Sequence, residues 1–117
     1  MNNITAFGKL ISDQTRLKII KLLSIRPLCV CEMMDICRIN QPCISQHLAI
    51  LKYHNLLKSR RDGKWTVYEI DKRVLRRYLS GLSRFMAGSL AGVGELKKES
   101  KRFKNLKSRL VLCRKCK

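Results

Sequence analysis

The chain has 117 residues, of which 45% are hydrophobic and 29% are charged, and this composition fits about one globular domain. It excludes a wholly disordered chain and a collagen-like repeat. The 26 Lys and Arg residues against 8 Asp and Glu residues give a formal net charge of +18, which predicts a polyanionic partner, with nucleic acid as the first candidate.

The N-terminal residues do not have the pattern of a secretory signal, and no apolar run has the length that a membrane helix needs. We therefore expect a cytoplasmic protein, in which thiols stay reduced. Six cysteines in such a chain indicate metal or redox chemistry more than structural disulfides.

Two helices are predicted at the start of the chain. Residues 4–11 repeat apolar side chains at helical spacing. Ser12 and Asp13 are cap residues for a second helix, which the Arg-Pro pair ending at Pro27 should stop. The core-facing side of that second helix is predicted to hold Leu17, Ile20 and Leu23, widened by Ile19 and Leu22.

A third helix over about residues 29–37 and a fourth helix ending near His54 are predicted on either side of a short turn. Asn40 is a good N-cap for the fourth helix, and Asn55 suits the left-handed position after it. Its apolar stripe is formed by Ile44, Leu48 and Leu51.

The apolar period then changes from helical to alternating. Residues 57–61 and 64–70 predict two strands of a hairpin, with Asp62-Gly63 as a type I′ turn. The order helix, helix, helix-turn-helix, hairpin predicts a mainly α fold with a β-hairpin wing, which is a winged helix-turn-helix.

A fifth helix is predicted from about Val74. Its apolar stripe and its small residues favour packing against a second copy of the chain, although a simple core helix would show the same stripe. We therefore predict residues 1–95 as a DNA-binding and dimerisation domain. Residues 96–117 form a basic tail, which is either helical or ordered only on DNA. The stripe consists of Leu75, Leu79, Leu82, Met86 and Leu90.

Four stretches of the chain resemble the arsenic-repressor (ArsR/SmtB) family of metal-sensing winged-helix repressors. They are SDQTRLKIIKLL (12–23), LCVCEM (28–33), QPCISQHLAIL (41–51) and LLKSRRDGKWTVYEI (56–70). The Cys-Val-Cys of residues 29–31 is similar to the thiolate motif of the arsenite- and antimonite-responsive or cadmium- and lead-responsive branches. The resemblance implies a homodimeric repressor, not an enzyme, that leaves double-stranded operator DNA when its inducer binds.

The polar side of the fourth helix is the predicted DNA-recognition surface. Gln and Ser side chains near its N-terminus can bond base edges in the major groove. The basic wing tip suits phosphates or the minor groove, although charge on an edge hairpin can also serve solubility alone. The predicted DNA-binding residues are Gln41, Ser45, Gln46, His47, Lys52, Arg60, Arg61 and Lys64, with Lys58 also on the wing.

Cys29 and Cys31 are predicted to bind trivalent arsenic or antimony, which favour thiolates. Residues two apart do not share a helix face, so the two thiols converge only if Cys29 lies at the cap, outside the helix. Binding would then bend the first turn.

The family's best-known arsenite pattern has a third Cys where this chain has Met34. We predict that Cys113 or Cys116, from the same or the partner chain, supplies the third thiolate. Two thiolates plus solvent are the alternative, and all four thiolates would suit cadmium or lead. Cys37 is expected to pack in the core and Cys43 to have a structural role.

Other functions remain open at this level. The same fold could carry a thiol redox or persulfide sensor, and the charge alone could serve an RNA-binding protein. We find no phosphate-binding glycine loop and no nucleophile–base set, so we expect neither an enzyme nor an organic cofactor. The resemblance also implies a zinc site on the fifth helix that begins with the pattern Asp-x-His. This site is not expected here, because Arg73 stands two residues after Asp71 in place of His, and no His occurs in residues 74–100.

Overall fold

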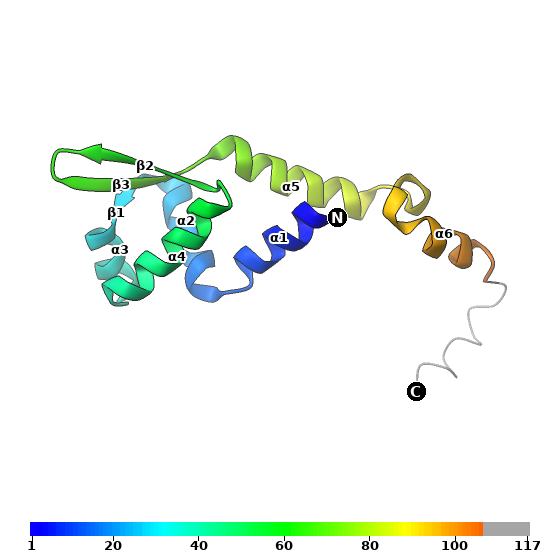
Figure 1. The fold of residues 1–117 in the computed structure, drawn as a ribbon, viewed down its shortest axis with the longest axis horizontal. Coiled ribbons are helices and arrows are strands. Elements are labelled where there is room, and N and C mark those ends of the chain that lie inside the picture. Colours follow the sequence, from blue (N-terminus) through cyan, green and yellow to red (C-terminus); the bar gives the residue numbers. More distant parts are fainter. Residues whose placement is uncertain (107–117) are drawn as a thin grey trace, which may run out of the picture. The chain divides into compact units, whose positions relative to one another are not determined.

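The computed structural model of the protein describes residues 1–106, which form helices and one small antiparallel sheet (Figure 1). The chain divides into two compact units, Met1–Leu82 and Ser83–Lys117, and each is described by itself. No helix in the described part is both long enough and apolar enough to span a membrane. The first unit contains α1 (Asn2–Ile11), α2 (Gln14–Ile25), β1 (Leu28–Cys29), α3 (Val30–Cys37), α4 (Gln41–Tyr53), β2 (Leu57–Asp62), β3 (Trp65–Ile70) and most of α5 (Lys72–Ala87).

The junction of α1 and α2 is held by side chains at the start of α2. Asp13 caps α2 as predicted, because its carboxylate accepts a bond of 3.0 Å from the Arg16 backbone N–H. The Arg16 guanidinium donates to the carbonyls of Leu10 at 3.0 Å and Lys9 at 2.9 Å. These carbonyls belong to the last turn of α1, where the helix itself supplies no donor. Arg16 therefore fixes the angle between the two helices.

Replacing Arg16 with Ala is expected to lower the free energy of unfolding by about 1–3 kcal/mol, because the partly buried Leu10 carbonyl and the exposed Lys9 carbonyl lose a charged donor. Lys18→Ala, at an exposed position of the same helix, should change it by no more than about 0.5 kcal/mol. Urea unfolding of the two variants measures the difference. Equal losses would contradict the assigned role of Arg16.

The helix-turn-helix is formed by α3 and α4, which pack together. Arg38 ends α3 in the left-handed conformation, with φ of 57°, and its N–H bonds the Met34 carbonyl. Asn40 caps α4 as predicted by accepting from the Cys43 N–H at 3.0 Å. Asn55 has φ of 62°, which confirms the predicted left-handed residue after the helix.

The core of the first unit gathers the apolar faces of α2, α3 and α4 over the base of the sheet. The predicted stripe of α4 is buried, whereas the prediction for α2 is partly wrong, since Leu17 is 48% exposed. The core face of α2 is centred on Leu23, roughly 120° around the helix from Leu17. The fully buried side chains are Leu10, Ile19, Met33, Ile44, Leu48, Leu51 and Leu56.

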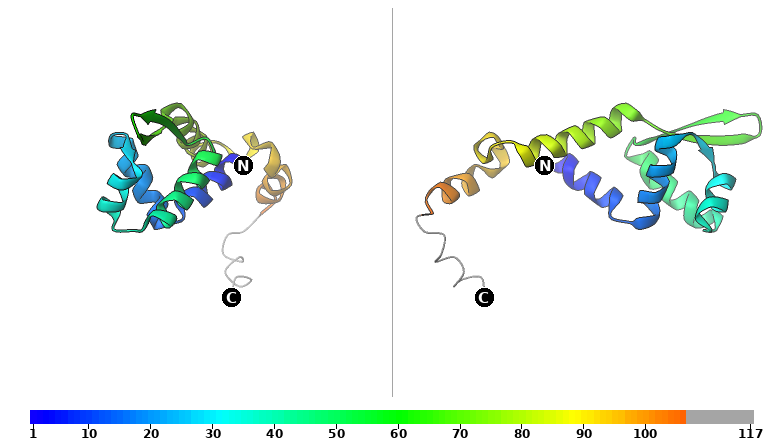
Figure 2. Two further views of the ribbon diagram at one scale, coloured as in Figure 1. Left: turned by 60° about the vertical axis from the view of Figure 1, so that its left-hand side comes forward. Right: turned by 180° about the vertical axis from the view of Figure 1, so that it is seen from behind.

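The sheet has the order β1-β3-β2, and the hairpin β2–β3 projects from the helices of its unit as the predicted wing (Figure 2). The winged helix-turn-helix prediction is therefore confirmed. The turn prediction is wrong in register: Asp62 pairs with Trp65, so the loop residues are Gly63 and Lys64. Of these two loop residues, only Gly63 has a positive φ. A type II′ turn needs a positive φ at the first loop residue alone, whereas type I′ needs it at both.

The short strand β1 was not predicted. It pairs with β3 through Leu28 opposite Tyr68 and Cys29 opposite Val67. A two-residue strand has no period by which the sequence could indicate it. Its consequence is that the residue before α3 is joined directly to the wing.

The predicted fifth helix is shorter than its apolar stripe. Helix α5 ends at Ala87, and Leu90 lies in the 3-10 turn η1 (Leu90–Gly92). The chain leaves the helix because the Ser89 side chain caps η1, accepting from the Gly92 N–H at 3.2 Å. The turn η2 (Gly94–Leu96) and helix α6 (Lys97–Lys104) follow in the second unit. The domain boundary at residue 95 stays a prediction.

Candidate DNA-binding surface and thiol site

The predicted DNA-recognition surface lies on the side of α4 away from the core. Gln41, Ser45 and Gln46 are exposed, while the stripe of α4 is buried beneath them. None of the three makes a side-chain hydrogen bond within residues 1–106. Their polar atoms are therefore available to base edges, which is the requirement for direct readout.

His47 differs from these three because it turns toward α2. It is half-buried, with Nδ1 3.4 Å from Arg16 Nη1 and Nε2 3.9 Å from Asp13 Oδ1. Since a guanidinium only donates, Nδ1 is the acceptor and Nε2 carries the hydrogen that faces Asp13. The backbone N–H of Arg16 is the largest cause that lowers the pKa of Asp13. Sequence reasoning missed this link, which joins the recognition helix to the start of α2.

The wing presents the predicted cations at exposed positions. Arg60 and Arg61 lie on β2, and Lys64 lies in the loop with its Nζ 5.4 Å from the centre of the Trp65 ring. The Lys52 ammonium group donates a hydrogen bond of 2.6 Å to Ser59 Oγ. It therefore braces the last turn of α4 against β2, in addition to its predicted phosphate contact.

Cys29 lies at the junction of β1 and α3. It is the N-cap of α3 with extended φ and ψ of −90° and 168°, so it lies outside the helix as the convergence argument required. Its backbone N–H donates to Glu32 Oε1 at 3.0 Å, which forms a capping box. Glu32 Oε2 accepts from Arg26 at 2.6 Å. Cys29 is half-buried and Cys31 is exposed.

The capping box predicts an acid-sensitive start of α3. The backbone N–H of Cys29 is the largest cause that lowers the pKa of Glu32, followed by the Cys29 thiol. A lowered carboxylate pKa adds stability above the unfolded-state pKa, and this stability is lost as the pH falls through the folded-state pKa.

Glu32→Gln should therefore lower the melting temperature by about a few degrees at neutral pH and by less at acidic pH. Thermal unfolding followed by circular dichroism over that range measures the convergence. A difference that stays constant with pH would contradict the role of the ionised carboxylate. Glu69→Gln, on β3, is the matched control.

Cys31 borders a shallow surface depression of about 480 Å³. Its other walls are Met34, Asp35, Arg38 and Ile39. Within residues 1–106 no group of three or more His, Cys, Asp or Glu side chains is arranged to hold a metal ion. At the start of α3 the described part thus offers two thiols, those of Cys29 and Cys31.

The remaining cysteines are not part of this pair. Cys113 and Cys116, the predicted sources of a third thiolate, lie outside the described residues. Cys37 is half-buried against the core, as predicted. Cys43 is exposed in the first turn of α4, and its backbone N–H is the group that Asn40 caps.

Part of the chain is similar to known regulatory proteins. Residues 13–59 match the family model described as bacterial regulatory protein, arsR family. The arsenical resistance operon repressor of Escherichia coli (strain K12) is 42% identical over 67 residues, which are 56% of this chain and 57% of that protein. The match thus spans little more than half of that relative's length.

Two further matches cover a larger share of the matched protein's own length. The arsenical resistance operon repressor of Staphylococcus aureus is 32% identical over 64% of this chain and 72% of its own length. A homodimeric winged helix-turn-helix DNA-binding domain from Mycobacterium bovis, described as a possible ArsR-family regulator, has a TM-score of 0.59 and 25% identity. It covers 70% of this chain and 77% of its own. The chain therefore belongs to the ArsR family of bacterial regulatory proteins, which are winged helix-turn-helix DNA-binding regulators and not enzymes.

Proposed function

We propose that the protein is a transcriptional repressor that binds operator DNA as a homodimer and is released when trivalent arsenic or antimony binds the thiolates of Cys29 and Cys31. The observation that carries the proposal is the position of this pair. Cys29 caps the helix that packs on the recognition helix, and Cys31 lies in its first turn. The arsenical resistance repressors among the relatives support the choice of inducer.

DNA recognition divides between two elements. The exposed polar side chains of α4 read bases in the major groove, and the wing cations Arg60, Arg61 and Lys64 contact phosphates. Because the wing contacts are electrostatic, operator affinity falls steeply with salt.

The dimer uses the apolar side of α5. The helix has no buried residue, and within its apolar stripe Leu75 and Leu82 are only half-buried. Leu79 is 48% exposed and Met86 73% exposed. A face of this kind is covered efficiently by its own copy about a twofold axis. The homodimeric M. bovis domain supports this choice.

Inducer binding is a ligand exchange without a change of oxidation state. Arsenous acid carries three hydroxyl groups, and each thiol replaces one of them as its proton leaves with the hydroxide as water. Cys29 and Cys31 replace two. The third position keeps hydroxide or takes the sulfur of Cys113 or Cys116.

The exchange disturbs α3 because both sulfurs must reach one arsenic atom. Cys31 borders the depression with Met34 and Asp35, whereas the Cys29 thiol lies beside Glu32 in the capping box. Bringing the sulfurs together therefore opens the box or unwinds the first turn. The strain has two routes to the DNA-binding surface: packing of α3 on α4, and pairing of Cys29 with Val67 on the wing. The inducer thus biases a two-state element.

Two alternatives use the same cysteines. Cadmium or lead would take four thiolates from Cys29, Cys31, Cys113 and Cys116. A redox or persulfide sensor would form a disulfide between Cys29 or Cys31 and Cys113 or Cys116 without metal, with an oxidant or a reactive sulfur species taking up the two electrons and two protons. Neither alternative changes the predicted DNA surface.

The test is fluorescence anisotropy of the reduced protein on a duplex from upstream of its own gene at fixed salt. Arsenite, antimonite, cadmium and diamide are titrated separately. The proposal expects two chains per duplex and release by arsenite or antimonite. Release by diamide alone would replace it with the redox sensor, release by cadmium alone with the cadmium sensor, and the absence of specific DNA binding would overturn it in favour of RNA.

A further inference from the structure

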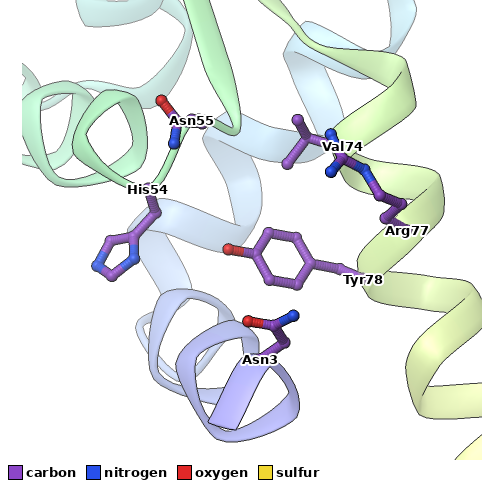
Figure 3. A pocket seen from close by; sticks show the side chains of 6 residues that line it. All are labelled: Asn3, His54, Asn55, Val74, Arg77 and Tyr78. Atoms are coloured by element: carbon purple, nitrogen blue, oxygen red, sulfur yellow. The ribbon is translucent and has the colours of Figure 1, made fainter.

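A second pocket lies away from the cysteines, where α1, the end of α4 and α5 meet within the first unit (Figure 3). Its volume is about 190 Å³. Figure 3 shows the Tyr78 hydroxyl directed toward the His54 ring, with the Asn3 amide beside them and the Arg77 guanidinium next to Val74. The lining consists of Asn3, His54, Asn55, Val74, Arg77 and Tyr78.

The polar side chains of this pocket are hydrogen-bond donors without an opposing acid. A guanidinium, two amides, a phenol and an imidazole line it, and no Asp or Glu does. Within residues 1–106 none of these five side chains has a hydrogen bond or ion pair with another protein group. A pocket lined by unused donors that include one cation and no acid favours an anion.

The Tyr78 donor is held in place before any ligand arrives. The Tyr78 ring stacks on Phe7, with ring centres 5.0 Å apart and planes 10° from parallel. His54 is the C-cap of α4, and its ring meets the Tyr53 ring edge-on at 5.2 Å. Preorganised donors lose little conformational entropy on binding. The half-buried Tyr78 ring and Val74 add an apolar wall.

We propose that this pocket binds a small anion whose carboxylate or oxyanion head is held by Arg77, Tyr78 and His54. The head can belong to a free inorganic oxyanion or to a compact organic acid that rests its body on Val74. An anion bound there joins the last turn of the recognition helix to α5. The Asp71 N–H, just before α5, already bonds the Leu56 carbonyl beyond that turn at 2.8 Å. The inference does not rest on the proposed repressor function.

The chain offers a residue-specific readout because it has only two histidines, His47 and His54. Ring resonances of the full-length reduced protein are followed by NMR while inorganic phosphate or benzoate replaces chloride at constant ionic strength. The His54 resonances are expected to move saturably and those of His47 to stay in place. Saturation by phosphate alone assigns an inorganic oxyanion, and saturation by benzoate alone assigns an organic acid.

Arg77→Gln and Arg73→Gln remove the same charge from exposed positions of one helix, but only Arg77 lines the pocket. The first should weaken binding at least about tenfold and the second less than about twofold. Tyr78→Phe keeps the stack on Phe7 and should weaken binding through the missing hydroxyl alone. Equal loss in the two Arg variants, parallel movement of both histidines, or no saturable shift with either anion would overturn the site.

Discussion

Cys29→Ser is expected to leave operator affinity within about twofold of the unchanged protein and to raise the arsenite concentration for half release by about 100-fold or more. Arsenic held by two sulfurs gains from the second bond being intramolecular, and a hydroxyl is a poor replacement for a thiolate. Serine still accepts at a helix N-cap, so α3 keeps its start. Cys31→Ser should behave in the same way. Anisotropy on the upstream duplex gives both quantities in one titration.

Cys43→Ser is the matched control for this pair. Cys43 is exposed on the recognition helix itself, yet it lies outside the proposed site. Its variant should respond to arsenite as the unchanged protein does. The account fails if Cys43→Ser loses the response, or if Cys29→Ser and Cys31→Ser both retain it.

The second large effect separates base contacts from phosphate contacts. Gln46→Ala is expected to cost about 1–3 kcal/mol per half-site on the operator and little on a scrambled duplex, because an exposed amide reads base edges. Arg61→Gln should weaken both duplexes alike and reduce the salt slope by about one for each phosphate that the variant no longer neutralises. Binding isotherms at several salt concentrations measure both.

Lys21→Gln removes one positive charge from an exposed position of α2 and controls for net charge alone. It should change the salt slope less than Arg61→Gln does. Equal slopes in the two variants would mean that the wing acts only through overall charge. If Gln46→Ala weakens binding to the scrambled duplex as much as binding to the operator, Gln46 is not part of the DNA-recognition surface.

Features of the fold that depend on neighbouring residues could be predicted from the sequence. Asp13 and Asn40 cap the helices that follow them through bonds to the backbone three residues on, and such local bonds are visible in the residue types. The left-handed Asn55 and the buried stripe of α4 are of the same kind. Cys29 lies at the cap, outside the helix, which is the condition that the sequence argument set for the two thiols to converge.

Features that depend on distant partners could not be predicted. Strand β1 exists only because β3 pairs with it, and Cys29 meets Val67 far along the chain. His47 lies 31 residues after Arg16, so its contact with the start of α2 leaves no periodic signal. The thiol site stays a prediction: Cys29 and Cys31 are two residues apart in the sequence, whereas Cys113 and Cys116 lie outside the described residues.

The most direct test of the central proposal is alkylation of the thiols, mapped by peptide mass spectrometry, in the reduced full-length protein with and without arsenite. The account predicts that arsenite protects Cys29 and Cys31 while Cys43 keeps its reactivity. Protection of Cys113 or Cys116 at the same concentration would identify the third ligand. Undiminished alkylation of Cys29 and Cys31 in arsenite that releases the DNA would contradict the account, because the inducer would then act elsewhere.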